Sequence, residues 1–154
     1  MLRGTEPVPE FDCSLEIRQA KPAEFAGVAA AVCAAFGMPP PFGAWFEALA
    51  HRECWRAYAA LDGASVVGGG FLYRKDAHAW LGAGGVLPDY RGRNAHRVLM
   101  AMRIRDAIAA GCLHIVSETG EPIGDEANPS LTNMQRRGFR QVASRLNFAA
   151  PIVA

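Results

Sequence analysis

Val86-Leu-Pro-Asp-Tyr-Arg-Gly-Arg-Asn-Ala-His-Arg-Val-Leu-Met100 is the stretch that decides the fold, because here an apolar strand ends in a basic turn that opens a long helix. A helix start presents unpaired backbone N–H groups and the positive end of the helix dipole. Arg91, Arg93 and Arg97 add charge that suits a pyrophosphate group. Arg-rich helix starts are also common on solvated surfaces, so the turn alone leaves ligand binding and plain solvation both open.

The segments on either side of this turn predict one domain that mixes strands and helices. Residues 1–13 hold two prolines and no periodic pattern, so we expect an N-terminal tail or linker there and a domain over residues 14–154. Apolar alternation predicts strands, and apolar residues at helical spacing predict helices. The expected strands cover residues 15–17, 55–61, 66–73, 79–87, 112–117 and 141–148, and the expected helices cover residues 25–36, 42–51, 92–110 and 130–137.

Composition and charge exclude several classes of protein. The chain has 154 residues, of which 51% are hydrophobic and 20% charged, as in an ordinary globular domain. Sixteen Lys and Arg against fifteen Asp and Glu leave no basic excess for nucleic acid. The four cysteines form no CxxC pair, and no apolar run reaches the roughly 18 residues that span a bilayer. We therefore expect a cytoplasmic protein without a metal site and without nucleic-acid or membrane partners.

Two segments resemble the cofactor-binding motifs of the GNAT acetyltransferase superfamily. Arg91-Gly-Arg-Asn-Ala-His96 resembles the family motif Arg/Gln-x-x-Gly-x-Gly/Ala, which lies at a strand-to-helix turn. Asn128-Pro-Ser-Leu-Thr-Asn-Met-Gln-Arg-Arg-Gly-Phe139 resembles the second cofactor segment, a short helix ending in Gly-Phe before the last strand. The order of the expected elements also agrees with the family over about residues 14–150, which strengthens a weak local signal.

The resemblance implies a fold and a cofactor. The fold would be an α/β (α+β) GNAT-like one, with a mixed, mostly antiparallel sheet of about six strands flanked by helices and with strands four and five splayed apart. The cofactor would be acetyl-CoA, and the backbone of the fourth strand would pair with its pantetheine arm. Glycines at 82, 84 and 85 suit such a close approach independently. The residues expected to bind the cofactor are Gly85, Val86, Leu87, Arg91, Gly92, Arg93, Asn94, Ala95, His96, Arg97, Ser130 and Asn133.

Three positions depart from the family pattern. Asn94 and His96 stand where glycine and a small residue are usual; Asn tolerates a positive φ, whereas His adds bulk beside the phosphate path. Met134 stands where many relatives carry a tyrosine that protonates the leaving thiolate, and a thioether cannot donate a proton.

The activity implied by the resemblance is transfer of an acetyl group to a primary amine on a small molecule or peptide. Such a transfer needs a base near the thioester, and Glu118, at the end of the fifth strand, is the candidate. An exposed loop carboxylate is the alternative for Glu118. The alternative function is a non-catalytic acyl-CoA-binding or regulatory domain, and a homodimer is one assembly that either function allows.

Overall fold

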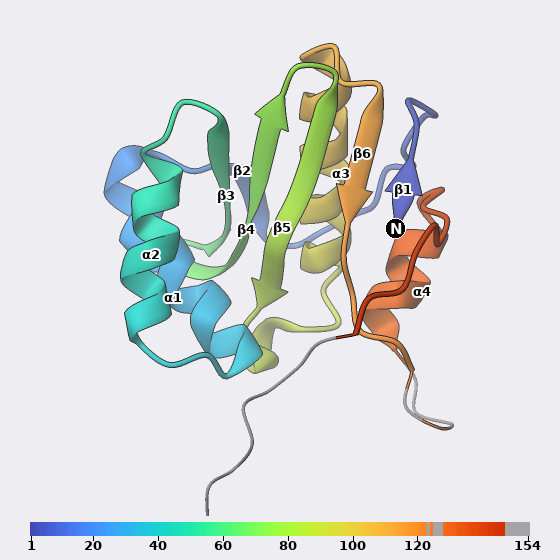
Figure 1. Ribbon diagram of the computed structural model, residues 1–154. Helices are drawn as coiled ribbons and strands as arrows, with labels where there is room; N and C mark the ends of the chain where they lie inside the picture. Colours follow the sequence, from blue (N-terminus) through green and yellow to red (C-terminus); the bar gives the residue numbers. More distant parts are fainter. Residues whose placement is uncertain (123, 125–127, 147–154) are drawn as a thin grey trace, which may run out of the picture.

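The computed structural model describes residues 1–122, 124 and 128–146, and it is built around a six-stranded sheet with the order β1-β6-β5-β4-β3-β2 (Figure 1). All neighbouring strands are antiparallel except β5 and β6, which are parallel. The strands are β1 (Leu2–Arg3), β2 (Glu16–Gln19), β3 (Trp55–Asp62), β4 (Ser65–Lys75), β5 (His78–Val86) and β6 (His114–Ser117). The helices are α1 (Phe25–Phe36), α2 (Pro41–Ala50), α3 (Ala95–Ala109) and α4 (Pro129–Gln135), with short 3-10 turns η1 (Pro22–Glu24) and η2 (Pro88–Tyr90).

Helices cover the sheet on both faces and bury two apolar clusters. On one face α3 places Leu99 and Ile104 against strand residues such as Leu81. On the other face α1 and α2 bury Val28 and Phe46, together with residues of β3 and β4. Alternation along the strands therefore sends successive side chains to opposite cores, as the sequence pattern predicts.

The structure departs from the sequence predictions at its two ends. Residues 141–146 form no strand where the last one was expected, and residues 147 and 148 lie outside the described residues. The reason is that Leu2 and Arg3, expected to be part of a tail, pair with Val116 and Ile115 and occupy the edge beside β6. Arg140 makes only an isolated bridge to Leu2. Val142 and Leu146 consequently remain exposed.

The strands that the sequence counts as fourth and fifth are β5 and β6, and they separate partway along their length. Their parallel pairing runs from His78 and His114 to Leu81 and Ser117 and then stops. Beyond Leu81, β5 continues to Val86 without a partner on that side (Figure 1). The predicted splay is confirmed, and residues of its free β5 segment line one pocket with the start of α3.

The described residues show neither a membrane-spanning helix nor a cluster of metal ligands. None of the helices there combines the length and the apolar character that crossing a membrane requires. Among the same residues, no group of three or more His, Cys, Asp or Glu could hold a metal ion.

Candidate cofactor pocket

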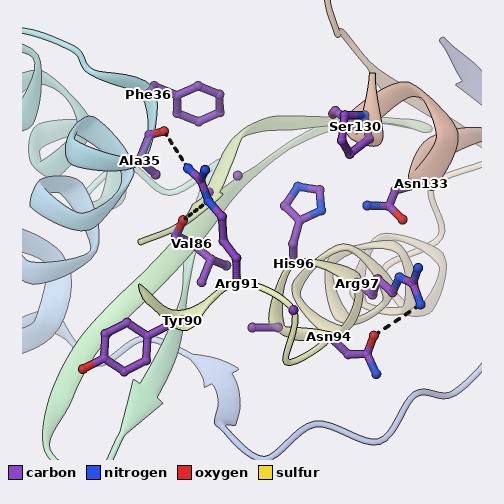
Figure 2. A pocket seen from close by; sticks show the side chains of 15 residues that line it. Ala35, Phe36, Val86, Tyr90, Arg91, Asn94, His96, Arg97, Ser130 and Asn133 are labelled. Carbon is purple, nitrogen blue, oxygen red and sulfur yellow. Dashed lines mark hydrogen bonds between the residues drawn. The ribbon is translucent and has the colours of Figure 1, made fainter. Parts of the chain in front are cut away.

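A cavity of about 540 Å³ lies where the free half of β5 meets the start of α3 (Figure 2). This volume falls in the range of small-molecule sites, roughly 300–1,000 Å³. Its lining comes from α1, β5, the turn before α3, the first turn of α3, and α4. The lining residues are Ala35, Phe36, Gly84, Gly85, Val86, Tyr90, Arg91, Gly92, Asn94, Ala95, His96, Arg97, Pro129, Ser130 and Asn133.

The turn into α3 depends on two residues in the left-handed region. Gly92 has φ 79° and Asn94 has φ 61°. Asn is one of the few residues with a side chain that tolerates this conformation, so the expectation for position 94 is confirmed. The Asn94 side chain also fixes the turn, since its Nδ2 donates to the Asp12 carbonyl at 3.0 Å and its Oδ1 accepts from Arg97 Nη1 at 3.3 Å.

The three arginines of this turn point in different directions. Arg91 reaches across the pocket, where its Nε donates to the Val86 carbonyl at 3.2 Å and its Nη2 to the Ala35 carbonyl at 3.4 Å (Figure 2). Arg97 also lines the pocket. Arg93 does not line it, because its guanidinium donates to Ser14 Oγ at 2.8 Å and lies 3.6 Å from the Asp62 carboxylate.

The wall formed by β5 is backbone rather than side chain. A Cβ on Gly85 would lie 2.7 Å from the Ala35 Cβ, and a Cβ on Gly84 would lie 2.5 Å from the Arg103 guanidinium. Real Cβ contacts are essentially never this short, so both positions require glycine while their neighbours stay in place. The result is a strand edge that has no partner strand on the β6 side, and such an edge is what an added strand or an amide-containing ligand binds.

His96 sits at the centre of the pocket, between Arg91 and the two polar residues of α4 (Figure 2). Burial, and then the charges of Arg103 and Arg137, lower the pKa of His96 to about 4, while a hydrogen bond with the Gly84 backbone acts in the opposite direction. The imidazole is therefore neutral at physiological pH. The bulk expected from the sequence is present, and it lies beside the strand edge.

Helix α4 contributes Ser130 and Asn133, one turn apart on the pocket side. Asn128, rather than Ser130, caps the helix, since its Oδ1 accepts from the Leu131 N–H at 2.9 Å. Ser130 is thus free to face the pocket. Met134 does not line the pocket; its side chain is buried in the core on the α3 face.

Glu118 lies away from the pocket. Its carboxylate is exposed, does not line the cavity and forms an ion pair with Arg145 at 2.5 Å. In the described structure Glu118 is thus an exposed, ion-paired loop carboxylate, and its role as the base stays a prediction.

The structure brings ten of the twelve predicted cofactor residues into one pocket. The two exceptions are Arg93, which points to Ser14, and Leu87, which packs against the core. Sequence reasoning missed Ala35, Phe36, Tyr90 and Pro129, and it noted Gly84 only as part of a glycine run. No local signal identifies Ala35 or Phe36, because their role depends on how the end of α1 meets β5.

A family model for the Acetyltransferase (GNAT) domain matches residues 25–121, which include the splayed strand and the turn into α3. The chain belongs to the GNAT acetyltransferase family. No curated protein is similar enough in sequence to count as a match to this GNAT domain.

Solved structures show the same fold at low sequence identity. An aminoglycoside acetyltransferase from an uncultured soil metagenomic sample is 21% identical, with a TM-score of 0.71 over 90% of this chain and 99% of that one. AAC(6')-Iy, solved with the bisubstrate analogue CoA-S-monomethyl-acetylneamine, is 18% identical, with a TM-score of 0.70 over 89% of this chain and 98% of that one. A Trypanosoma brucei acetyltransferase is 17% identical, with a TM-score of 0.70 over 89% and 100%. The predicted GNAT-like fold is confirmed.

The residues of this GNAT domain fit acetyl-CoA on structural grounds. The glycine-lined edge of β5 offers backbone groups to the pantetheine amides, and Arg91 and Arg97 lie beside the start of α3 where a pyrophosphate would be attracted. No acidic residue is found among the described residues that line the pocket. An elongated ligand with amides at one end and phosphates at the other suits this arrangement.

Proposed function

We propose that this GNAT domain transfers the acetyl group of acetyl-CoA to a primary amine of a small molecule or peptide. One observation carries the proposal: the free half of β5, lined by glycine, meets a basic helix start in a single cavity. Solved structures with this fold include aminoglycoside acetyltransferases, which supports a small-molecule amine as the acceptor. A cytoplasmic location and a homodimer remain predictions from the sequence.

The residues divide the binding of the ligand between them. Arg91, Arg97 and the N–H groups at the start of α3 would hold the phosphates. The Val86 carbonyl now accepts from Arg91, so it becomes available to the pantetheine arm when that side chain turns toward the phosphates. When bound, acetyl-CoA supplies an acetyl group activated as a thioester.

The groups that would transfer protons during acetyl transfer are less evident than the groups that would bind the ligand. The neutral His96 imidazole can donate or accept one hydrogen bond in the pocket, but its lowered pKa makes it a weak base. Ser130 and Asn133 offer further hydrogen bonds. Glu118 remains the proposed general base, and that role requires its ion pair with Arg145 to open.

The test is thiol release from acetyl-CoA over a panel of amines, with mass spectrometry of the acceptor. We expect release that depends on the amine and an acceptor that gains one acetyl group. Thiol release that gives no acetylated amine with any acceptor of the panel would contradict the proposal. A thermal-shift series with CoA runs beside it, because a ligand at about 100 times its dissociation constant adds about 2.7 kcal/mol to the stability of the folded state.

A non-catalytic acyl-CoA-binding domain is the second candidate. It is favoured by the burial of Met134 in the core and by the exposed, ion-paired Glu118, which together leave the pocket without an evident acid and base. CoA binding without thiol release in the presence of any amine would support this second function.

A further inference from the structure

Arg103 is an arginine buried in the core between α3 and the sheet, with 2% of its surface exposed. Its Nη1 donates to the Phe71 carbonyl at 3.1 Å and to the Gly82 carbonyl at 2.9 Å, and its Nε donates to the Leu99 carbonyl of its own helix. Among the described residues no carboxylate pairs with it. Burial of a cation without a counter-charge costs desolvation energy, which its hydrogen bonds must offset. The arrangement of the backbone around Arg103 should therefore explain why it is buried.

The explanation lies in a bulge of β5. Gly69 pairs with Gly85, and Phe71 pairs with Gly82, so β5 has one more residue than β4 between these two pairs. A bulge interrupts the ladder and leaves backbone groups without their regular partners. The two carbonyls that accept from Arg103 belong to Phe71 and Gly82, the pair at which the regular register ends. The guanidinium therefore donates to carbonyls of both strands at the point where the bulge begins.

Glycines give the guanidinium its space. A Cβ on Gly70 would lie 2.8 Å from the Arg103 Cζ, and a Cβ on Gly84 would lie 2.5 Å from its Nη2. Gly84 lines the pocket, whereas Arg103 and Gly70 do not. A helix residue outside the pocket thus contacts the back of the strand edge that forms the pocket wall.

We propose that Arg103 is a positioning residue for acyl-CoA, whose guanidinium holds the β5 bulge so that the edge from Gly84 to Val86 keeps the shape that binds the pantetheine arm. The inference rests on the proposed function. It applies to the arm and not to the phosphates, because Arg103 contacts β4 and β5 and makes no hydrogen bond to the turn before α3. Loss of Arg103 should therefore affect one end of the ligand.

The experiment compares two ligands by calorimetry: CoA, and the nucleotide fragment of CoA that keeps the phosphates and lacks the arm. For Arg103→Met, which keeps much of the length and has no donor, we expect the dissociation constant of CoA to rise about tenfold, or about 1.4 kcal/mol. That of the fragment should change by less than about twofold. Arg103→Lys, which can still donate to the two carbonyls, should recover part of the CoA affinity.

Gly70→Ala offers a second route that keeps the arginine. The new methyl group would displace the guanidinium, so it should weaken CoA and spare the fragment in the same way. Gly43→Ala, at a helical position with nothing within 4 Å, is the matched control and should leave both affinities unchanged.

Equal weakening of CoA and fragment in folded Arg103→Met and Gly70→Ala would overturn the positioning role, because general loss of structure affects both ends alike. Unchanged CoA affinity in both variants would overturn it as well. Failure of the wild-type protein to bind either ligand is a distinct result, and it would overturn the proposed function first.

Discussion

Strand β5 has a closed half, residues 78–81, and an open half, residues 82–86, which differ in how they are paired and in what they contact. From His78 to Leu81 the strand is paired on both sides, and Ala79 and Leu81 are buried in the core. From Gly82 onward it is paired only with β4, and three of its five residues are glycine. In the closed half, the neighbouring strands pair with the backbone on both sides, and the side chains fill the core. The open half has no partner strand on the β6 side and mostly glycines, so the pocket lies where the parallel pairing with β6 ends.

Filling the open half should give the largest effect. For Gly85→Val, the new side chain would meet Ala35 and Phe36, and we expect CoA affinity to fall more than about 100-fold, with a stability loss of about 1–3 kcal/mol from overpacking. Titration of CoA followed by calorimetry measures the first effect, and urea unfolding measures the second.

Leu81→Ala in the closed half is the matched contrast. It removes buried volume and should cost about 2–5 kcal/mol of stability, while the folded protein keeps its CoA affinity. Wild-type affinity in Gly85→Val, or a large affinity loss in Leu81→Ala, would remove the distinction between the two halves.

Charge at the mouth of the open half should have the next largest effect. Arg91→Glu places a carboxylate where phosphates would bind and should raise the dissociation constant of CoA more than about tenfold, with a weaker salt dependence. Arg93→Glu should have a smaller effect because Arg93 faces Ser14 and Asp62. Equal effects of the two reversals would mean that the direction of the side chains is unimportant.

His96, which lines the pocket beside the open half, should give a pH effect of intermediate size. Its pKa is lowered from 6.5 to about 4, so the unfolded chain takes up the proton first as the pH falls. Stability should therefore be highest above about pH 6.5 and should fall between there and about pH 4. Melting temperatures of wild type and His96→Gln measured through this window should converge toward acid pH. Melting temperatures of the two proteins that change in parallel with pH would contradict the lowered pKa of His96.

Met134→Tyr should have the smallest effect on the ligand. The methionine is 5% exposed in the core, so a tyrosine there must bury its hydroxyl or displace α4, and we expect a stability loss of about 1–3 kcal/mol. CoA affinity and the rate of thiol release should remain near wild type. A clear gain in the rate of thiol release would show that the phenol reaches the pocket and supplies the proton donor that Met134 cannot provide.

The sequence predicts well the features that depend on neighbours along the chain. Helices such as α1 and strands such as β3 follow from their own periodicity, and the turn at Asn94 follows from residue type. The family resemblance adds the splay and most of the pocket. These signals lie within segments of a few turns or strands, where spacing alone carries the information.

Features that depend on distant contacts were not predictable. The alternating pattern of residues 141–148 resembles a strand, but β1 already occupies the edge beside β6. The burial of Arg103 depends on glycines in two other elements, and nothing in the sequence of α3 indicates which of its arginines lies inward. The place of Glu118 at a strand end makes it a candidate base, whereas the direction of its side chain depends on Arg145.

The short strand β1 also has a consequence for the order in which the protein folds. Its two residues pair with Val116 and Ile115 and bridge to Arg140, so this edge can form only after a very long loop has closed. Loop closure of this length is entropically unfavourable, and few local contacts offset it. We therefore expect β1 to dock last during folding and to open first in hydrogen exchange, with its amides protected far less than those of β3 and β4. While it is open, β6 becomes an unprotected sheet edge, the kind of surface through which partly folded chains associate.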